Sequence, residues 1–149
     1  MTAFLNRIGP KIKIANTLIE KELNKEFGEI FRDYSLTGAQ ISLMIYLYDS
    51  KERKITQKEV ADIFVLSHPT IRGIVKRLEA NKLIVTSRLE NDQRQIVLEL
   101  SNEGFNLIDK NIFKIRTIMT NINKRITKDL SKQEISELEQ VLNKISANF

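Results

Sequence analysis

Apolar residues recur at helical spacing along most of the chain. In the first run, over residues 4–26, they lie three and four positions apart: Leu5, Ile8, Ile12, Ala15, Ile19 and Leu23. Because a helix turns about every 3.6 residues, this spacing gathers them on one face. It predicts an amphipathic helix that ends near Gly28.

Several hydroxyl residues mark where later helices begin. Ser or Thr followed three positions later by Gln or Glu forms a capping box. Its hydroxyl accepts a hydrogen bond from a free backbone amide, and the longer side chain accepts one from the amide of the Ser or Thr. Pairs with this spacing at the start of an apolar run are Thr37 with Gln40, Thr56 with Glu59, and Ser131 with Glu134. Ser67 and Pro69 fit the start of one more helix, which we expect to end near Asn81.

The pattern changes to a period of two before residue 101. Ile96, Leu98 and Leu100 alternate with Val97 and Glu99, which is typical of a strand. A second short apolar run covers residues 83–88, and the polar residues 90–93 separate the two. We expect a β-hairpin with a charged tip.

Helical spacing returns after the hairpin and continues for three heptads. Its apolar positions are Phe105, Ile108, Ile112, Ile115, Met119, Ile122 and Ile126. Such a repeat indicates a seam between helices. Together with the first helix it offers more apolar surface than one small lobe can cover, so we expect an obligate homodimer.

This order of elements predicts a mainly α fold with a small β-hairpin wing, in the α+β class. Two short helices within residues 56–80, joined by a tight turn and followed by a hairpin, are the layout of a winged helix-turn-helix. In that fold the second helix enters the DNA major groove and the hairpin reaches the backbone or the minor groove. We assign residues 36–101 to this lobe, and residues 1–35 and 102–149 to a helical dimerisation region.

The second short helix would turn a polar face outward. Arginine and lysine on that face suit guanine edges and phosphates, and glycine permits a close approach of the backbone. The candidate DNA contacts are Ser67, His68, Thr70, Arg72, Gly73, Lys76 and Arg77. A solvated helix face is the alternative interpretation. The net charge is +5 for the whole chain, and residues 67–94 hold six basic and three acidic residues, which favours DNA.

A set of short motifs falls in order along the chain. They are Leu36-Thr37-x-x-Gln40, Thr56-x-x-x-Val60-Ala61, Leu66-Ser67-x-x-Thr70-Ile71, Arg77-Leu78-Glu79, Leu83-Ile84, Asp92-x-Arg94 and Leu100-Ser101-x-x-Gly104. As an ordered set they resemble the MarR (multiple-antibiotic-resistance regulator) family of bacterial transcription factors.

The resemblance implies a twofold-symmetric dimer with interlocking terminal helices, here residues 4–27 and 102–147. The residues expected at that interface are Leu5, Ile8, Ile12, Ile115, Met119, Ile122, Leu138, Leu142 and Ile145. It also implies a wing whose arginine meets the minor groove, with Asp92 holding Arg94 or the wing tip. A simple surface ion pair is the alternative. The wing candidates are Arg88, Asn91, Asp92, Gln93 and Arg94.

Three positions depart from the family pattern. Gln93 stands where many relatives have a second arginine, which suggests a weaker grip by the wing. Lys82 replaces a frequent glycine, so we expect Asn81 to adopt the left-handed conformation there instead. Val65 replaces a small turn residue, and the turn between the paired helices is expected to differ.

Many members of the resembled family bind small, often anionic aromatic molecules between the dimer helices and the lobe. Arg32, Tyr34, Tyr46 and Tyr48 lie near the segments that would border such a crevice. Packing of the tyrosines with their hydroxyls at the rim is an equal alternative. The chain has no cysteine, which argues against sensing of peroxides through a thiol.

Other classes of function have little support. His68 is the single histidine, and without cysteine it cannot form the usual zinc site. No nucleophile motif or phosphate-binding glycine loop occurs, so we expect no enzyme, no metal and no cofactor. We see no signal peptide and no apolar run of about 18 residues, and expect a cytoplasmic protein.

We therefore expect a repressor that binds a pseudo-palindromic DNA duplex as a homodimer, with relief by a small effector implied by the resemblance. An activator would show the same features. The alternatives are a helical protein–protein interaction module that has lost specific DNA binding, and a basic amphipathic protein on membrane surfaces.

Overall fold

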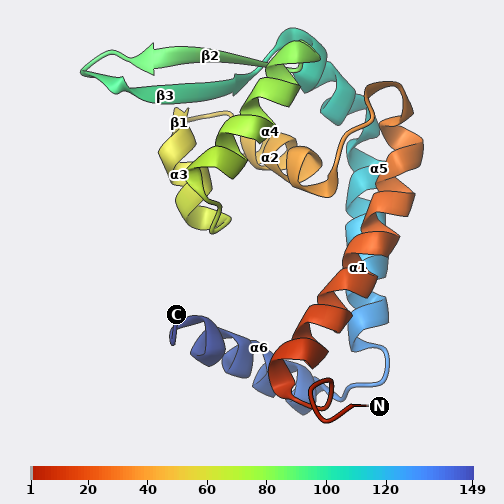
Figure 1. Ribbon diagram of the computed structural model, residues 1–149. Coiled ribbons are helices and arrows are strands. Elements are labelled where there is room, and N and C mark those ends of the chain that lie inside the picture. Colours follow the sequence, from red (N-terminus) through yellow and green to blue (C-terminus); the bar gives the residue numbers. More distant parts are fainter. Residues whose placement is uncertain (1) are drawn as a thin grey trace.

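The computed structural model describes residues 2–149. Its lobe of short helices and a small sheet is joined to a limb in which α1 and α5 run side by side and α6 turns away at the far end (Figure 1). The elements are α1 (Ile8–Ile30), the 3-10 helix η1 (Arg32–Tyr34), α2 (Gly38–Asp49), β1 (Ile55–Thr56), α3 (Gln57–Ile63), α4 (His68–Ala80), β2 (Ile84–Leu89), β3 (Asp92–Leu100), α5 (Asn102–Thr127) and α6 (Lys132–Ser146).

Side-chain caps begin α2, α4 and α6 where the sequence predicts them. The capping boxes of Thr37 with Gln40 and of Ser131 with Glu134 are both complete. Ser67 accepts the amide of Thr70 at the start of α4 at 3.3 Å. These bonds satisfy amides that the first helical turn leaves free, and so fix the residue at which each helix starts.

The first helix begins and ends later than its pattern predicts. It starts at Ile8 rather than near residue 4, and it passes through Gly28 to Ile30. Phe27 and Phe31 are both buried, and their rings meet edge to face 6.4 Å apart. Their burial holds the last turn in helical form, which outweighs the flexibility of an exposed glycine.

The hairpin is confirmed, and it belongs to a three-stranded antiparallel sheet in the order β1-β3-β2. Glu90 and Asn91 form the turn, so Asp92 and Gln93 lie in β3 rather than at an irregular tip. The third strand, β1, places Ile55 opposite Leu98. We call β2, β3 and their turn the wing.

The core lies where α2, α4, α5 and the sheet meet. It contains the inner face of α4 that the sequence predicts: Ile71, Ile74, Val75 and Leu78. Because these four residues are buried, the opposite face of α4 is turned to solvent.

The end of α4 differs from the prediction. Lys82 adopts the left-handed conformation with φ of 59°, whereas Asn81 remains right-handed with φ of −83°. Leu83 is fully buried and its amide donates to Leu78 O, which fixes the register of this turn. The left-handed position therefore falls on Lys82, immediately before Leu83.

The apolar seam of α5 packs against α1 of the same chain over much of its length. Ile115 is 0% exposed and Ile122 is 8% exposed. The protomer itself therefore covers both of these residues, which the sequence analysis assigns to the contact with a partner. Within residues 2–149, no helix is long and apolar enough to cross a lipid bilayer.

Candidate nucleic-acid interface

The outer face of α4 presents all the residues that the sequence assigns to it. Every one of these residues is exposed, including the three cations: Ser67, His68, Thr70, Arg72, Gly73, Lys76 and Arg77. The Ser67 and Thr70 hydroxyls are also hydrogen-bonded to each other at 2.8 Å. The amino end of α4 is therefore held in a fixed geometry while its cations extend into solvent.

A basic groove lies between α4 and the wing. It has a volume of about 410 Å³, and cations line it from both sides, among them Arg72 and Lys76 from α4 and Arg88 and Arg94 from the wing. One acid, Glu79, also lines it and accepts a hydrogen bond from Thr86 at 3.1 Å. Two consecutive elements thus present one electropositive surface, which suits a polyanion.

The wing holds Arg94 through Asp92. The backbone amide and Nε of Arg94 both donate to Asp92 Oδ1, at 3.1 and 3.2 Å, and Gln95 donates to Oδ2 at 3.2 Å. These bonds hold the pKa of the Asp92 carboxyl below its usual value, and the bond from Gln95 contributes most. The Arg94 side chain remains 92% exposed, so its guanidinium is oriented at one edge and free to bind at the others.

Gln93, which stands where many family members have a second arginine, closes the wing turn. Its amide nitrogen lies 3.3 Å from Leu89 O and 3.4 Å from Glu90 O. Arg88 and Asn91 are both exposed. The wing therefore presents two arginines, and Gln93 shapes the turn that carries them.

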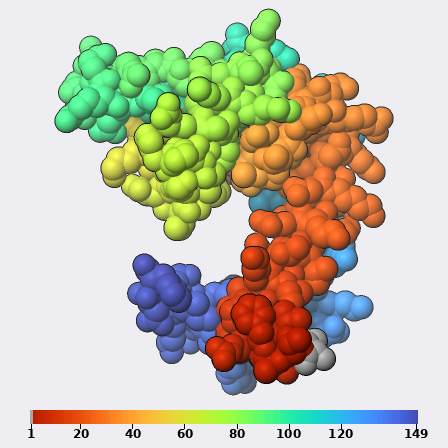
Figure 2. All heavy atoms as spheres, viewed as in Figure 1, coloured from red at the N-terminus to blue at the C-terminus, as the bar shows by residue number. Residues whose placement is uncertain are grey.

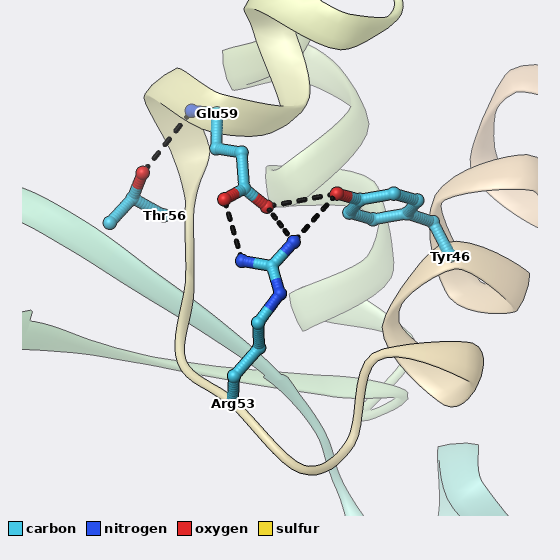
Figure 3. Close-up of polar contacts among 4 residues, drawn as sticks. All are labelled: Tyr46, Arg53, Thr56 and Glu59. Atoms are coloured by element: carbon cyan, nitrogen blue, oxygen red, sulfur yellow. Dashed lines mark hydrogen bonds and ion pairs between the residues drawn. The ribbon is translucent and has the colours of Figure 1, made fainter.

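A polar network behind the interface joins α2, the following loop and α3 (Figure 3). Arg53 donates to both carboxylate oxygens of Glu59, at 2.7 and 3.0 Å, and the Tyr46 hydroxyl donates to the same carboxylate at 2.9 Å. The pKa of Glu59 is lowered, chiefly by the hydrogen bond from Arg53. Thr56 still caps α3 through the Glu59 amide, but the Glu59 side chain does not complete the predicted capping box.

Two residues of this region carry no signal in the sequence pattern. Arg53 lies in the loop before β1, in a charged stretch that reads as solvated surface. Gln57 is 7% exposed and lines the basic groove. Their roles depend on the short strand β1, which brings this loop against the wing. That pairing joins positions more than forty residues apart and leaves no local pattern.

The residues proposed for an effector crevice are not gathered in one place. The Tyr34 hydroxyl donates to Glu103 at 2.8 Å and the Tyr48 hydroxyl to Asp109 at 2.6 Å, so both tyrosines bind α5. Tyr46 instead faces Arg53 and Glu59, and Arg32 is exposed on η1. The structure thus places these side chains at separate polar contacts, and their role in effector binding stays a prediction.

The far end of the limb carries apolar side chains that the chain does not cover. No residue of α6 is buried, and Leu138, Val141 and Leu142 are 36%, 47% and 46% exposed. Ile8, Ile12 and Met119 are also exposed, while Leu5 and Ile145 are half-buried.

Within residues 2–149, no cluster of three or more His, Cys, Asp or Glu side chains could hold a metal ion.

Known proteins resemble this chain in sequence and in fold. The family model for "Transcriptional regulator SarA/Rot" matches residues 25–111. The HTH-type transcriptional regulator MgrA of Staphylococcus aureus is 26% identical over 133 residues, which is 87% of this chain and 84% of MgrA.

Two solved structures of DNA complexes have the same fold. The S. aureus MepR–DNA complex superposes with a TM-score of 0.80 at 18% identity, covering 96% of this chain and 98% of that chain. A mutant MarR from E. coli complexed with operator DNA gives 0.76 at 20% identity, covering 97% and 99%. The predicted MarR-type winged helix-turn-helix fold is confirmed.

Proposed function

Because the chain belongs to the SarA/Rot family of transcriptional regulators, we propose that it binds double-stranded DNA sequence-specifically as a homodimer. The observation that carries this proposal is the basic groove between α4 and the wing, which arginines line from both sides. A groove of this kind can receive the phosphate backbone while the exposed face of α4 reaches base edges.

The exposed residues of α4 take the roles of major-groove contacts. Arg72 and Lys76 lie one turn apart and suit guanine edges or phosphates, and Thr70 adds a hydroxyl. Gly73 leaves room for a close approach, since a Cβ at this position would meet no atom within 4 Å. Arg94, oriented by Asp92, takes the minor groove beside it.

Dimerisation uses the helices within residues 1–35 and 102–149, which interlock with those of a second chain. The uncovered apolar residues of α6 and of the first turns of α1 support this division. A twofold dimer binds half-sites about one helical turn apart, so we expect a pseudo-palindromic operator of roughly 16–22 base pairs. Repression follows where the operator overlaps a promoter.

The role that we propose is one of binding and not of catalysis. The groove offers cations and hydroxyls for a polyanion, without a nucleophile and base held together. The relatives regulate transcription in bacteria, so we place this protein in the cytoplasm, where the chromosome is accessible. Control by a small molecule is a further part of the proposal.

The function is tested by removing one arginine from each side of the groove. Arg72→Ala and Arg94→Ala should each weaken operator binding by about 1–3 kcal/mol at fixed salt, because each loses a base or phosphate contact. Arg116→Ala removes the same charge from the exposed surface of α5 and should leave affinity unchanged. The operator is first selected from random duplexes. The affinity of each variant for this operator is then measured by fluorescence anisotropy.

A salt titration adds an independent check. The logarithm of the wild-type affinity should fall steeply with the logarithm of salt concentration, and less steeply for either groove variant. Operator affinity that stays at the wild-type value in both groove variants would contradict the assignment of this surface to DNA.

A further inference from the structure

An acidic residue closes one end of the basic groove. Glu79 lies in the last turn of α4, and Thr86 is the third residue of β2. The Thr86 hydroxyl donates to Glu79 Oε2 at 3.1 Å, so a hydrogen bond joins the two walls of the groove. The space-filling view shows α4 and the wing side by side on one face of the lobe (Figure 2). We call the end of the groove at Glu79, where the chain passes through residues 81–83 into β2, its root.

The arginines of the groove lie farther from this root. Arg88 follows on β2 toward the turn of the wing, and Arg94 on β3 is closer still to that turn. Arg72 lies about two helical turns before Glu79. Lys76 is one turn away, but Glu79 takes part in none of the ion pairs within the part of the chain that the structure describes. The root therefore carries an unpaired negative charge, while the rest of the groove is positive.

Cations alone would make this groove attractive to any nucleic acid. Their attraction to phosphates does not depend on sequence, and proteins bind single strands in positively charged grooves that follow the backbone. A single strand is flexible and can reach the floor of the groove, where the buried residues Gln57 and Val75 lie. A duplex is wide and stiff, and its backbone stays at the mouth while α4 occupies the major groove.

We propose that Glu79 makes the groove selective for double-stranded DNA against single-stranded nucleic acid. Its carboxylate repels phosphates that move toward the root, and such repulsion acts within about 10 Å at about 0.1 M salt. A duplex backbone at the mouth meets this charge at longer range than a single strand inside the groove. Thr86 orients the carboxylate. The proposal rests on the proposed function, because it takes α4 and the wing as the surface that binds DNA.

The test compares Glu79→Gln with the wild-type protein on two probes, the selected operator duplex and one strand of that duplex. Glutamine keeps an oxygen for the hydrogen bond from Thr86 and removes the charge. Fluorescence anisotropy should show single-strand affinity rising by about three- to tenfold, the effect of one nearby charge in a mostly aqueous site. Duplex affinity should rise by a smaller factor. The gain should shrink as salt increases, because ions screen the repulsion.

Two further variants separate the charge of Glu79 from other causes. Glu99→Gln removes an exposed acid of β3 that does not line the groove, and should leave both affinities unchanged. Thr86→Val removes the hydrogen bond and keeps the charge of Glu79, so it should raise single-strand affinity much less than Glu79→Gln does.

Three results would overturn the role of Glu79. They are no gain in single-strand affinity for Glu79→Gln, an equal gain for the duplex, and the same gain in Thr86→Val or Glu99→Gln. If selection from random duplexes yields no operator, the proposed function fails. The single-strand measurements on the wild type and on Glu79→Gln then still decide whether the carboxylate keeps single strands out of the groove.

Discussion

Val65 occupies the turn between α3 and α4 in a conformation that β-branched residues rarely adopt. Its φ is 52°, and its side chain is 89% exposed, so no packing offsets the strain. The turn needs this conformation because the Leu66 amide donates to Ala61 O at 2.8 Å, which ends α3 and turns the chain toward Ser67.

Val65→Gly should therefore stabilise the protein. Relief of left-handed strain, less the added flexibility of glycine in the unfolded chain, should raise the free energy of unfolding by about 1 kcal/mol. The melting temperature should rise by about 2–4 °C. Val65→Ala keeps a Cβ and should gain less, and a lower melting temperature for Val65→Gly would show that the valine makes a stabilising contact.

At Gly104, glycine is required by lack of space and not by the backbone conformation. A Cβ built there would overlap the backbone carbonyl of Leu83. Gly104→Ala must push α5 away from the lobe and should cost about 1–3 kcal/mol in urea unfolding.

Gly28→Ala is the matched control for that prediction. Gly28 also lies in a helix, but its Cβ would meet nothing within 4 Å. This change should stabilise by about 0.5–1 kcal/mol, because alanine favours helix. Equal effects of the two substitutions would refute the close approach of α5 to Leu83.

At the scale of elements, α3 is held in place by charge as well as by packing. Glu59 joins Arg53 and Tyr46, so the first turn of α3 is tied to α2 and to the loop before β1. The Arg53 and Glu59 side chains are 54% and 30% exposed, and water weakens their attraction. The network positions α3 more than it stabilises the whole protein.

The effect of this network should depend on pH. The folded-state pKa of Glu59 is lowered, so its contribution is present above the ordinary value of 4.5 and is lost as pH falls through the lowered value. Wild type should unfold at a higher urea concentration than Glu59→Gln at neutral pH, by a small margin. That margin should vanish in strong acid, and a margin independent of pH would exclude the ionised carboxylate as its cause.

Periodicity and caps predicted the helices well, because both signals are local. The inner face of α4 and the hairpin followed from residues within a few positions of each other. The missed features depend on distant partners. β1 exists only against β3, Glu59 turns to Arg53 rather than to its own helix end, and Lys82 is left-handed because Leu83 is buried.

At the candidate interface, too, features with a local signal could be predicted and those with distant partners could not. The exposed face of α4 could be recognised from charge on an amphipathic helix, and the link from Asp92 to Arg94 from family resemblance. The hydrogen bonds of Tyr34 and Tyr48 could not be predicted, because their partners Glu103 and Asp109 lie more than sixty residues away on α5.

At the scale of the whole molecule, α6 packs only loosely against the rest of the chain that the structure describes. None of its residues is buried, although it carries a continuous apolar stripe that includes Leu138 and Leu142. An isolated helix of this length is marginal in water, so we expect packing against a second chain to provide its stability.

Leu142→Asp should therefore convert the dimer to a monomer and reduce helical content, since a charge would enter the interface. Sedimentation equilibrium and circular dichroism measure the two effects. Gln140→Asp places the same carboxylate on the opposite side of α6 and should remain dimeric. A folded monomer for the wild-type protein at micromolar concentration would contradict the proposed assembly.

Hydrogen bonds at the junction between α4 and α5 join the lobe to the limb. The Ser101 hydroxyl donates to Lys82 O at 2.6 Å and its amide to Leu83 O at 3.0 Å, while Gly104 lies against the same carbonyl. The end of α4, the root of the wing and the first turn of α5 are thereby fastened at one pivot. We therefore expect a tilt of α5 to move α4 and the wing with it, so that the angle between the α5 helices of the two proposed protomers sets the half-site spacing that the dimer can bind.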